Sequence, residues 1–378
     1  MDNALTGTDP IWAAGFMSGT SLDAVDAAMI LTDGQAVLDW GLVAERKYTP
    51  DERAALKRAV DAAIEWGWSG DRPPETQAAF TRACDVLTET HADAFAAMLE
   101  GWSGPAPVLA GIHGQTVLHR RPTGDRPGAT LQLLDAPALR ARIGLPLAVD
   151  FRTADVAAGG EGAPLAPAYH GALMDRMGPG PMAVLNLGGV ANVTLRDTGG
   201  QLIAFDTGPA NGPIDEWVEG HGRGTQDAEG RFAAAGTIHE GLLAQLFEHP
   251  WFAMAPPKSL DRYDFNANMA RGLTFEDGAA TLTAFSARAV AAGLAQLETQ
   301  PEKVVACGGG RRNPELMRML REACPCPVIS AEDAGWRGDS IEAEAFAFLA
   351  VRCARNLPIS WPETTGVPHP QTGGQLLA

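Results

Sequence analysis

One pattern occurs twice in this chain and strongly limits its possible folds: two apolar segments joined by a short glycine-containing turn, then a third apolar segment. The first turn is GTSLD (19–23) in one half and Gly188-Gly189 in the other. The apolar segments cover residues 12–18, 24–31 and 36–44 in the first half and 182–187, 191–195 and 202–205 in the second. Short apolar runs between turn residues are typical of antiparallel strands. The sequence therefore predicts two related halves, each opening with a three-stranded meander, that face each other across a ligand-binding cleft.

Helical periodicity alternates with further short apolar runs along the rest of the chain. The expected helices cover residues 51–66, 75–101, 136–143, 278–297, 313–322 and 340–356, and the expected strands cover 108–113, 130–134, 145–151, 303–306 and 327–330. Alternating helices and strands predict an α/β protein. A chain of 378 residues exceeds what one core usually supports, so we expect two domains. The turn-rich tail PETTGVPHPQTGG predicts an irregular segment.

Charge and cysteine content restrict the partners and the compartment. The formal net charge of -17 disfavours general attraction to nucleic acid or to an anionic membrane, so a phosphate ligand must be held by local groups. Five scattered cysteines indicate a reduced, intracellular protein. The N-terminal segment lacks the pattern of a signal peptide, and no apolar run approaches the roughly 20 residues of a membrane span. We therefore expect a soluble cytoplasmic protein.

The turn between the first two strands is a candidate phosphate site. Glycine and small hydroxyl residues in a tight turn can direct several N–H groups at one anion, although the same residues also suit an ordinary hairpin. Asp23 and Asp26 could hold a magnesium ion directly or through water. The Walker A pattern GxxxxGK[ST] is absent, so this is not a P-loop.

The second half offers three related features. Gly188 and Gly189 would let a phosphate approach the backbone, or would simply serve a tight hairpin. Gly308, Gly309 and Gly310 lie between a strand and a helix, a junction that can receive a nucleotide at the helix N-terminus. Asp206 ends the third strand, where it could cap a helix at 213–218 or contact a substrate.

Polar residues that follow apolar strands are the candidates for chemistry. Asp150 ends LPLAVD, where an ionised carboxylate over a cleft is suited to be a general base. Arg152 could form a structural ion pair with Asp150 or bind substrate. His113 and Gln115, beside a glycine, suit recognition of a polyhydroxylated ligand. The patterns HExxH and GxSxG are absent, which argues against a zinc hydrolase and an α/β-hydrolase.

Taken together, these segments resemble the anhydro-N-acetylmuramic acid kinase family. The matching segments, in the family's order, are GFMSGTSLDAVDAA, GIHGQTVLH, TLQLLD, VDFRTADVAAGGEGAPLAP, NLGGVANVT, FDTGPANGPID, CGGGRRNPELM and GDSIEAEAFAFLA. They span residues 15 to about 350, and TTGVPHPQTGG in the tail also fits. The chain departs from the family pattern at Ala24, at Glu161 and in the stretch 336–339, although Asp339 itself and Glu342 match the pattern.

The resemblance implies a fold and a set of site residues. The fold would be the two-domain actin and sugar-kinase (ribonuclease H-like) fold with a nucleotide cleft between the domains. Domain I would comprise residues 1–130 and about 343–378, and domain II residues 131–342. The implied nucleotide-binding residues are Gly19, Thr20, Ser21, Leu22, Asp23, Ala24, Val25, Asp26, Gly188, Gly189, Gly308, Gly309 and Gly310. The implied catalytic residue is Asp150, the expected substrate contacts are His113, Gln115, Arg152 and Asp206, and the expected magnesium ligands are Asp23 and Glu342.

The resemblance also implies an activity. The family's enzymes use ATP to open the 1,6-anhydro ring of anhydro-N-acetylmuramic acid with water and to phosphorylate O6, a transferase step of amino-sugar metabolism in peptidoglycan recycling. The alternative is a kinase for another hexose or amino sugar on the same fold. ATP and Mg²⁺ would be the cofactors, and a homodimer is expected.

Overall fold

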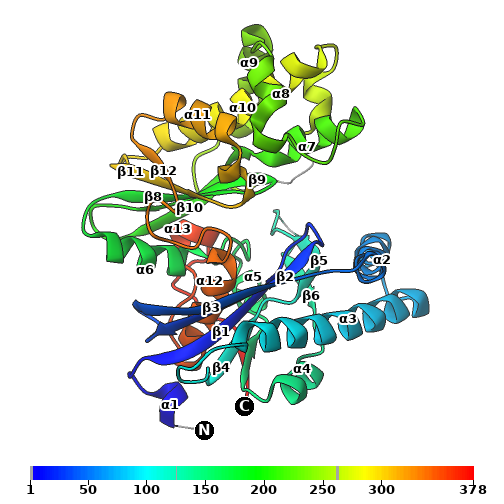
Figure 1. Cartoon of the computed structure of the whole chain (residues 1–378), viewed down its shortest axis with the longest axis vertical. Coiled ribbons are helices and arrows are strands. Elements are labelled where there is room, and N and C mark those ends of the chain that lie inside the picture. The colour runs from blue at the N-terminus through cyan, green and yellow to red at the C-terminus, as the bar shows by residue number, and fades with distance from the viewer. Residues whose placement is uncertain (1–2, 125, 261–263) are drawn as a thin grey trace. The chain divides into compact units, whose positions relative to one another are not determined.

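The computed structural model describes residues 3–124, 126–260 and 264–378 and contains two compact units (Figure 1). The first unit comprises Met1–Arg176 together with Ser340–Ala378, and the second comprises Met177–Asp339. The α/β class is confirmed by the alternation of helices and strands in both units.

A mixed six-stranded sheet forms the centre of the first unit. Its order is β13-β7-β4-β1-β2-β3, with β1, β2 and β3 antiparallel and β1, β4 and β7 parallel. The strands are β1 (Ile11–Ser18), β2 (Ala24–Thr32), β3 (Val37–Lys47), β4 (Leu109–Ile112), β7 (Leu147–Val149) and β13 (Gln375–Leu377). A separate pair, β5 (Gln115–Arg120) and β6 (Ala129–Leu133), belongs to the same unit. The predicted first meander is therefore confirmed.

Helices pack around the six-stranded sheet in the first unit. They are α1 (Asn3–Thr6), α2 (Pro50–Trp66), α3 (Pro74–Leu99), α4 (Ala136–Ile143), α5 (Thr153–Ala157), α6 (Pro167–Met177, whose last residue is assigned to the second unit), α12 (Ile341–Ala354) and α13 (Pro362–Thr365). The start of α2 follows from its sequence: Thr49 and Glu52 form a reciprocal capping box, and Pro50 occupies the first turn. Such local signals explain why α2 was predictable to within a residue.

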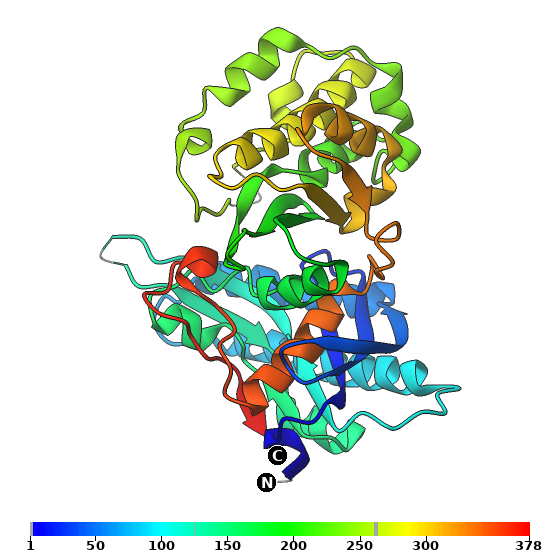
Figure 2. The ribbon, with the colours of Figure 1, turned by 90° about the vertical axis from the view of Figure 1, so that its left-hand side faces the viewer.

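Helix α12 lies unusually close to the sheet (Figure 2). A Cβ atom on Gly15 of β1 would be 2.0 Å from the Ala343 carbonyl oxygen, and one on Gly111 of β4 would be 2.0 Å from that of Phe346. Real Cβ atoms do not approach oxygen so closely, so only glycine at these positions allows the contact. Helix α12 is thus packed directly against the backbone of β1 and β4.

The second unit repeats the strand arrangement of the first. Its five-stranded sheet has the order β10-β9-β8-β11-β12, in which the meander β8-β9-β10 is antiparallel and β8, β11 and β12 are parallel. The strands are β8 (Met182–Leu187), β9 (Val190–Arg196), β10 (Leu202–Pro209), β11 (Lys303–Cys307) and β12 (Val328–Ser330). A meander followed by two parallel strands occurs in both sheets, so the predicted internal repeat is confirmed.

The remaining helices of the second unit pack around this sheet. They are α7 (Asn211–Gly220), η1 (Ala228–Gly230), α8 (Arg231–Ala235), α9 (Glu240–Phe247), η2 (Pro250–Ala253), η3 (Ala267–Ala270), α10 (Phe275–Ala295), η4 (Gly309–Arg312) and α11 (Pro314–Ala323). The apolar α10 is buried along most of its length and, with the inner faces of the strands, forms the main core of this unit.

Two expectations about organisation differ from the structure. The segment 131–176 was assigned to domain II, but it lies in the first unit because β7 pairs in parallel with β4 and antiparallel with β13. The segment 362–374 was expected to be irregular, but it begins with the short helix α13, and the residues that follow it form β13 against β7. The placement of 131–176 and the strand β13 both come from strand pairing over long sequence separations.

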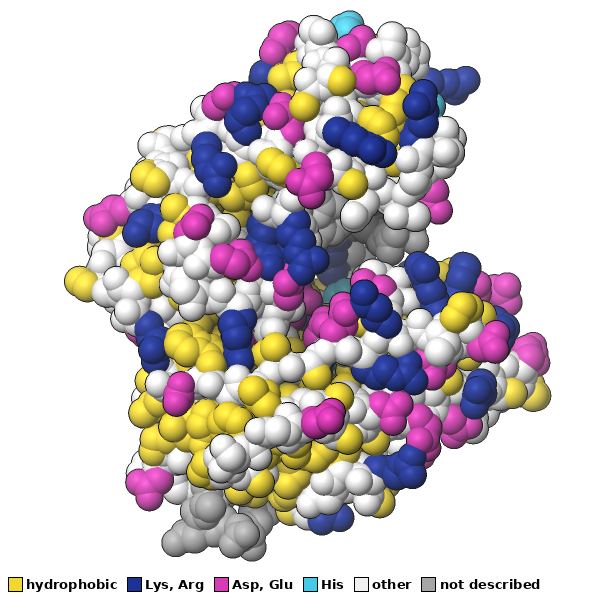
Figure 3. Space-filling view, viewed as in Figure 1, with side chains coloured by type: hydrophobic (Ala, Val, Ile, Leu, Met, Phe, Trp, Pro, Cys, Tyr) yellow, Lys and Arg dark blue, Asp and Glu magenta, His cyan; other side chains and the backbone are white. Residues whose placement is uncertain are grey.

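Two surface features complete the description. Hydrophobic side chains gather over β1 and β3 on the face seen in Figure 3, and Leu38 and Val43 of the edge strand β3 are exposed. Among the described residues, every helix is too short or too polar to span a bilayer.

Candidate active site

The parallel strands β1, β4 and β7 bring the predicted residues of the first unit to one edge of the sheet. Gly19 follows β1, His113 follows β4 and Asp150 follows β7. Neighbouring parallel strands point in the same direction, so their carboxyl ends lie side by side. The structure therefore collects at one edge three groups that are spread over more than 130 residues of sequence.

Asp150 stands at the end of β7 in an unusual backbone conformation. Its φ of 53° lies in the left-handed region, which aspartate tolerates better than most residues but which is still uncommon. The carboxylate accepts one hydrogen bond at each oxygen: the Thr153 hydroxyl donates to Oδ1 at 2.5 Å, and Gln375 Nε2 donates to Oδ2 at 2.8 Å. The predicted base is half-buried, and its carboxylate is held from two sides.

Among the described residues, Arg152 hydrogen-bonds with His113 and Gly162 rather than with Asp150. Arg152 Nε donates to His113 Nε2 at 2.9 Å, and Nη1 donates to the Gly162 carbonyl at 2.7 Å. Burial, together with the adjacent guanidinium, holds the pKa of His113 well below its usual range. His113 is therefore neutral and accepts the hydrogen bond through its unprotonated nitrogen. Burial also lowers the pKa of Arg152, to about 10, against the opposing charges of Glu342 and Asp155.

Gln115 connects this group to the first glycine turn. Its Nε2 donates to the Gly19 carbonyl at 3.3 Å, and the Ser18 hydroxyl donates to the Gly114 carbonyl at 3.2 Å. Gln115 is almost fully buried, and its Oε1 has no hydrogen-bond partner among the described residues. A buried acceptor without a partner is costly, so this oxygen is suited to receive a ligand hydroxyl or an ordered water.

The first turn is held by hydrogen bonds among its own polar groups. The Ser21 hydroxyl and the Ala24 N–H both donate to Asp23 Oδ1, at 2.6 and 3.1 Å. Leu22 has a φ of 55°, and its side chain is buried in the core together with that of Val25. Leu22 and Val25 can therefore meet a nucleotide only through their backbone groups.

The two glycine segments of the second unit lie against each other. A Cβ atom on Gly308 would be 2.8 Å from the Leu187 carbonyl, and one on Gly310 would be 2.7 Å from the Leu187 Cβ. Asn211 joins them, since its Nδ2 donates to the carbonyls of Leu187 and Gly188 at 3.1 Å each. The residues following Leu187 thus form one glycine-lined surface with 308–310. Asn211 was not selected from the sequence, although it lies inside the segment FDTGPANGPID.

A buried arginine is hydrogen-bonded to the 308–310 loop. Arg311 Nη1 donates to the Gly308 carbonyl at 2.9 Å, and the guanidinium binds Glu332 at 2.7 Å and Asp339 at 2.8 Å. Only 4% of the Arg311 side chain is exposed, whereas the two carboxylates are about half exposed. The segment 336–339, where the chain departs from the family pattern, therefore still supplies an anchor through Asp339.

Asp206 does not cap a helix. Helix α7 begins after Ala210 without a side-chain cap, and Asp206 Oδ2 instead accepts from the Leu260 N–H at 2.7 Å. The capping interpretation is wrong because β10 continues for three residues beyond Asp206 before the helix starts.

The expected magnesium ligands are two carboxylates of the first unit. Asp23 and Glu342 supply the carboxylate oxygens that Mg²⁺ prefers, and Glu342 interacts electrostatically with Arg152. No group of three or more acidic, histidine or cysteine side chains arranged for a metal occurs among the described residues. Mg²⁺ commonly uses one or two carboxylates together with substrate phosphates, so two carboxylates are compatible with such a role.

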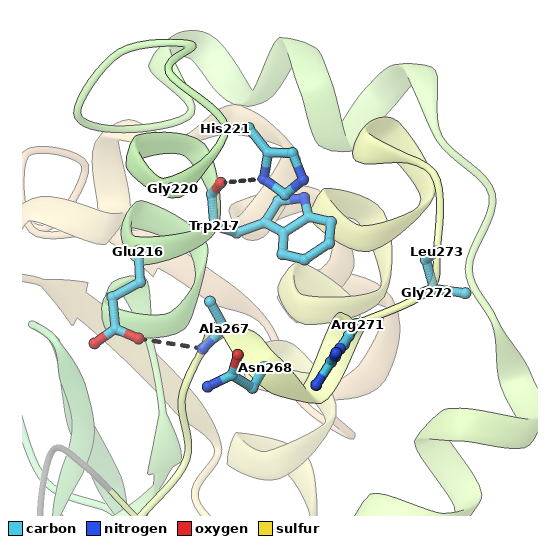
Figure 4. Close-up of a pocket in the computed structure, with 9 residues that line it drawn as sticks. All are labelled: Glu216, Trp217, Gly220, His221, Ala267, Asn268, Arg271, Gly272 and Leu273. Carbon is cyan, nitrogen blue, oxygen red and sulfur yellow. Dashed lines mark hydrogen bonds between the residues drawn. The ribbon is translucent and has the colours of Figure 1, made fainter.

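A separate cavity of about 510 Å³ lies in the second unit between α7 and η3 (Figure 4). Trp217, His221, Asn268 and Arg271 line it, and Glu216 Oε2 accepts from the Ala267 N–H at 3.1 Å on its wall. None of the residues selected from the sequence lines this cavity.

Comparison with known proteins gives one consistent result. The family model described as anhydro-N-acetylmuramic acid kinase matches residues 12–377. The chain is 50% identical over 366 residues to the anhydro-N-acetylmuramic acid kinase of Phenylobacterium zucineum, covering 96% of this chain and 98% of that protein. It is 48% identical over 372 residues to the protein of the same name from Rhizobium rhizogenes, covering 97% and 99%.

Solved structures are more distant. Component A of the (R)-2-hydroxyglutaryl-CoA dehydratase of Acidaminococcus fermentans is 13% identical with a TM-score of 0.47, over 91% of this chain and 99% of that chain. A ROK family glucokinase from Streptomyces griseus is 15% identical with a TM-score of 0.37, over 90% and 99%.

Proposed function

This chain belongs to the anhydro-N-acetylmuramic acid kinase family, and from that membership we propose that it is an ATP-dependent kinase of peptidoglycan recycling. Its substrate is 1,6-anhydro-N-acetylmuramic acid, and its product is N-acetylmuramic acid 6-phosphate. The repeated α/β architecture agrees with the actin and sugar-kinase fold that the sequence resemblance implied. The observation that carries the chemical proposal is the carboxylate of Asp150, held at both oxygens at the carboxyl edge of the first sheet.

Asp150 acts as the general base in this proposal. It takes a proton from a water molecule whose oxygen forms a bond to the anomeric carbon of the sugar. The bond from that carbon to O6 breaks, and O6 forms a bond to the γ-phosphorus of ATP while the bond to the leaving ADP oxygen breaks. Glycosidases usually protonate the leaving oxygen with a second carboxylic acid. Here the phosphoryl group takes the place of that proton, which agrees with a single candidate carboxylate.

Arg152, His113 and Gln115 bind and orient the sugar. Neutral His113 holds the Arg152 guanidinium through Nε, which fixes the plane of its remaining donors. The partnerless Gln115 Oε1 accepts a hydrogen bond from a sugar hydroxyl. Asp206 was expected to contact the substrate from the sequence. Its oxygen is used by Leu260, so we propose that it acts by holding the 258–260 segment.

The glycine segments bind the nucleotide through backbone groups. The turn 19–26 of the first unit and residues 188–189 and 308–310 of the second supply N–H groups for the phosphates. When bound, Mg²⁺ neutralises charge on the transferring phosphates, and Asp23 and Glu342 are the side chains that would hold it. We further propose a cytoplasmic homodimer, for which the exposed apolar side chains of β3 offer a contact surface.

The proposal is tested with ATP, magnesium and the anhydro sugar in ¹⁸O-labelled water, with product analysis by mass spectrometry. We expect one labelled oxygen in the sugar and none in the phosphoryl group, because water attacks carbon and O6 attacks phosphorus. Replacing Asp150 by Asn lowers kcat by about 10²–10⁴-fold, the usual contribution of a general base, while ATP binding measured by calorimetry is retained. Label in the phosphate, or full activity of D150N, would refute the mechanism. Equal activity on glucose would instead favour a general hexose kinase.

A further inference from the structure

The C-terminal strand delivers a side chain directly to the proposed base. Gln375 is the first residue of β13, and its register partner in β7 is Val149, the residue before Asp150. From this position Gln375 Nε2 donates to Asp150 Oδ2 at 2.8 Å across 225 residues of sequence. Gln375 directly follows TTGVPHPQTGG, the last of the segments quoted for the family resemblance, and lies within the stretch 12–377 that the family model matches.

The backbone before Gln375 is fixed by close contacts. A Cβ atom on Gly373 would be 3.0 Å from the Phe151 carbonyl, and one on Gly374 would be 2.9 Å from the Cys353 sulfur. Gly374 also has a φ of 87°, which favours glycine. The tail therefore reaches β7 along a path that leaves little freedom in the placement of residue 375.

The preceding part of the tail is tied to the same loop. The buried carboxylate of Asp155 accepts from the hydroxyls of Ser360 and Thr365, the latter at 2.6 Å, and from the Gly162 N–H at 2.7 Å. These bonds link the tail to the segment that follows Asp150. The tail is thus attached both before and at the point where Gln375 meets the base.

We propose that Gln375 is a positioning residue for Asp150 and that, together with Thr153, it holds the carboxylate in the orientation that accepts the proton of the attacking water. Each donor occupies a different oxygen, so rotation of the carboxylate about its terminal bond is restricted. This inference rests on the proposed role of Asp150 as the base.

The test introduces opposite charges at one position. In Q375E a negatively charged carboxylate replaces the neutral amide donor, and in Q375K a positively charged ammonium group replaces it. The readout is the acid limb of the pH profile of kcat/KM for the anhydro sugar at saturating ATP, which reports the base in the free enzyme. Q371E is the matched control: it makes the same chemical change four residues earlier, where the amide donates to the Thr372 carbonyl.

We expect the acid limb of Q375E to move to higher pH by about one unit, since like charges disfavour ionisation. That of Q375K should stay at or below the wild-type position, and that of Q371E should not move. If Gln375 had only a structural role, the acid limb would move in the same direction in Q375E and Q375K, or both variants would lose stability while the acid limb stayed in place. Superimposable limbs in folded Q375E and wild-type enzyme would overturn the proposal.

D150N separates this inference from the proposed function. If D150N is fully active, then Asp150 is not the base and both proposals fail. If D150N is inactive but Q375E keeps the wild-type profile, only the positioning role of Gln375 is wrong. Circular dichroism across the pH range establishes that each variant is folded where the rates are measured.

Discussion

Replacing Arg311 by Met tests how the 308–310 loop is held in place. Methionine keeps much of the length of the stem but removes the bond to the Gly308 carbonyl and both ion pairs. Removing one partner of a fully buried pair costs about 3–5 kcal/mol, because a charge is left without compensation. Here 53% of the Glu332 side chain and 56% of the Asp339 side chain are exposed, so water can solvate both once the arginine is gone. We therefore expect a smaller loss of about 2–3 kcal/mol in the free energy of unfolding.

The loss should depend on pH in a defined direction. The hydrogen bond from Arg311 lowers the pKa of Glu332. The pKa of Asp339 is also lowered, because the bonds from Arg311 and Arg312 outweigh the opposing effect of burial. A carboxyl whose folded pKa is lowered contributes stability that is fully present above its unfolded value, about 4, and that disappears as pH falls through the folded value. The gap between wild type and R311M should therefore be constant from pH 7 to about 5 and should shrink below about 4.

The assay is urea unfolding followed by circular dichroism, repeated at several pH values, with Arg312→Met as the control. Arg312 also pairs with Asp339, but 67% of its side chain is exposed, so we expect R312M to change stability by less than about 0.5 kcal/mol. A loss below about 0.5 kcal/mol in R311M, or a gap that persists unchanged at pH 3.5, would refute the reasoning. Because Arg311 holds the Gly308 carbonyl, R311M should also weaken ATP binding in calorimetry.

Two further predictions concern glycine and histidine. Gly308→Ala should lower the free energy of unfolding by about 2 kcal/mol or more and weaken ATP binding, because φ is 74° and the new Cβ would be 2.3 Å from Asn186 Oδ1. Gly309→Ala is the control. No described atom lies within 4 Å of its Cβ, so it should change stability little in the same unfolding assay. Burial lowers the pKa of His91 to about 4. Between its unfolded pKa of about 6.5 and pH 4, His91 binds a proton in the unfolded chain but not in the folded protein, so the free energy of unfolding falls by about 1.4 kcal/mol per pH unit as pH decreases. The free energy of unfolding should therefore depend less steeply on pH in His91→Leu over this window. An unchanged slope would contradict this explanation.

The local parts of the fold were predictable because their signals are local. The meanders follow from apolar runs and turn residues, and α2 follows from its capping box and Pro50. Strand β13 was missed because three residues after a turn-rich tail carry no periodicity of their own. Its strand conformation comes from pairing with β7, more than 200 residues earlier in the chain. The same pairing, together with that of β7 to β4, places residues 131–176 in the first unit.

The residues of the candidate site also fall into two groups: those that local sequence signals indicate and those whose roles depend on long-range contacts. Asp150, His113 and Gly19 could be selected because each follows an apolar strand, and parallel pairing brings such positions together. Gln375 and Asp155 could not, since their roles depend on contacts across more than 200 residues. Arg311 was not selected from the sequence, because only its burial in the folded protein distinguishes it from its neighbour Arg312.

The return of the chain to the first unit has a consequence for synthesis in the cell. Strands β1 and β4 leave the ribosome early, but α12, which lies against Gly15 and Gly111, is made only after the whole second unit. About 200 residues separate Arg176 from the end of the chain, which at the usual 5–20 residues per second corresponds to roughly 10–40 s of translation. During most of that interval the nascent first sheet lacks its covering helix, because residues 177–339 are made before α12. Truncated chains that stop before α12 should therefore require chaperones that shield apolar surface.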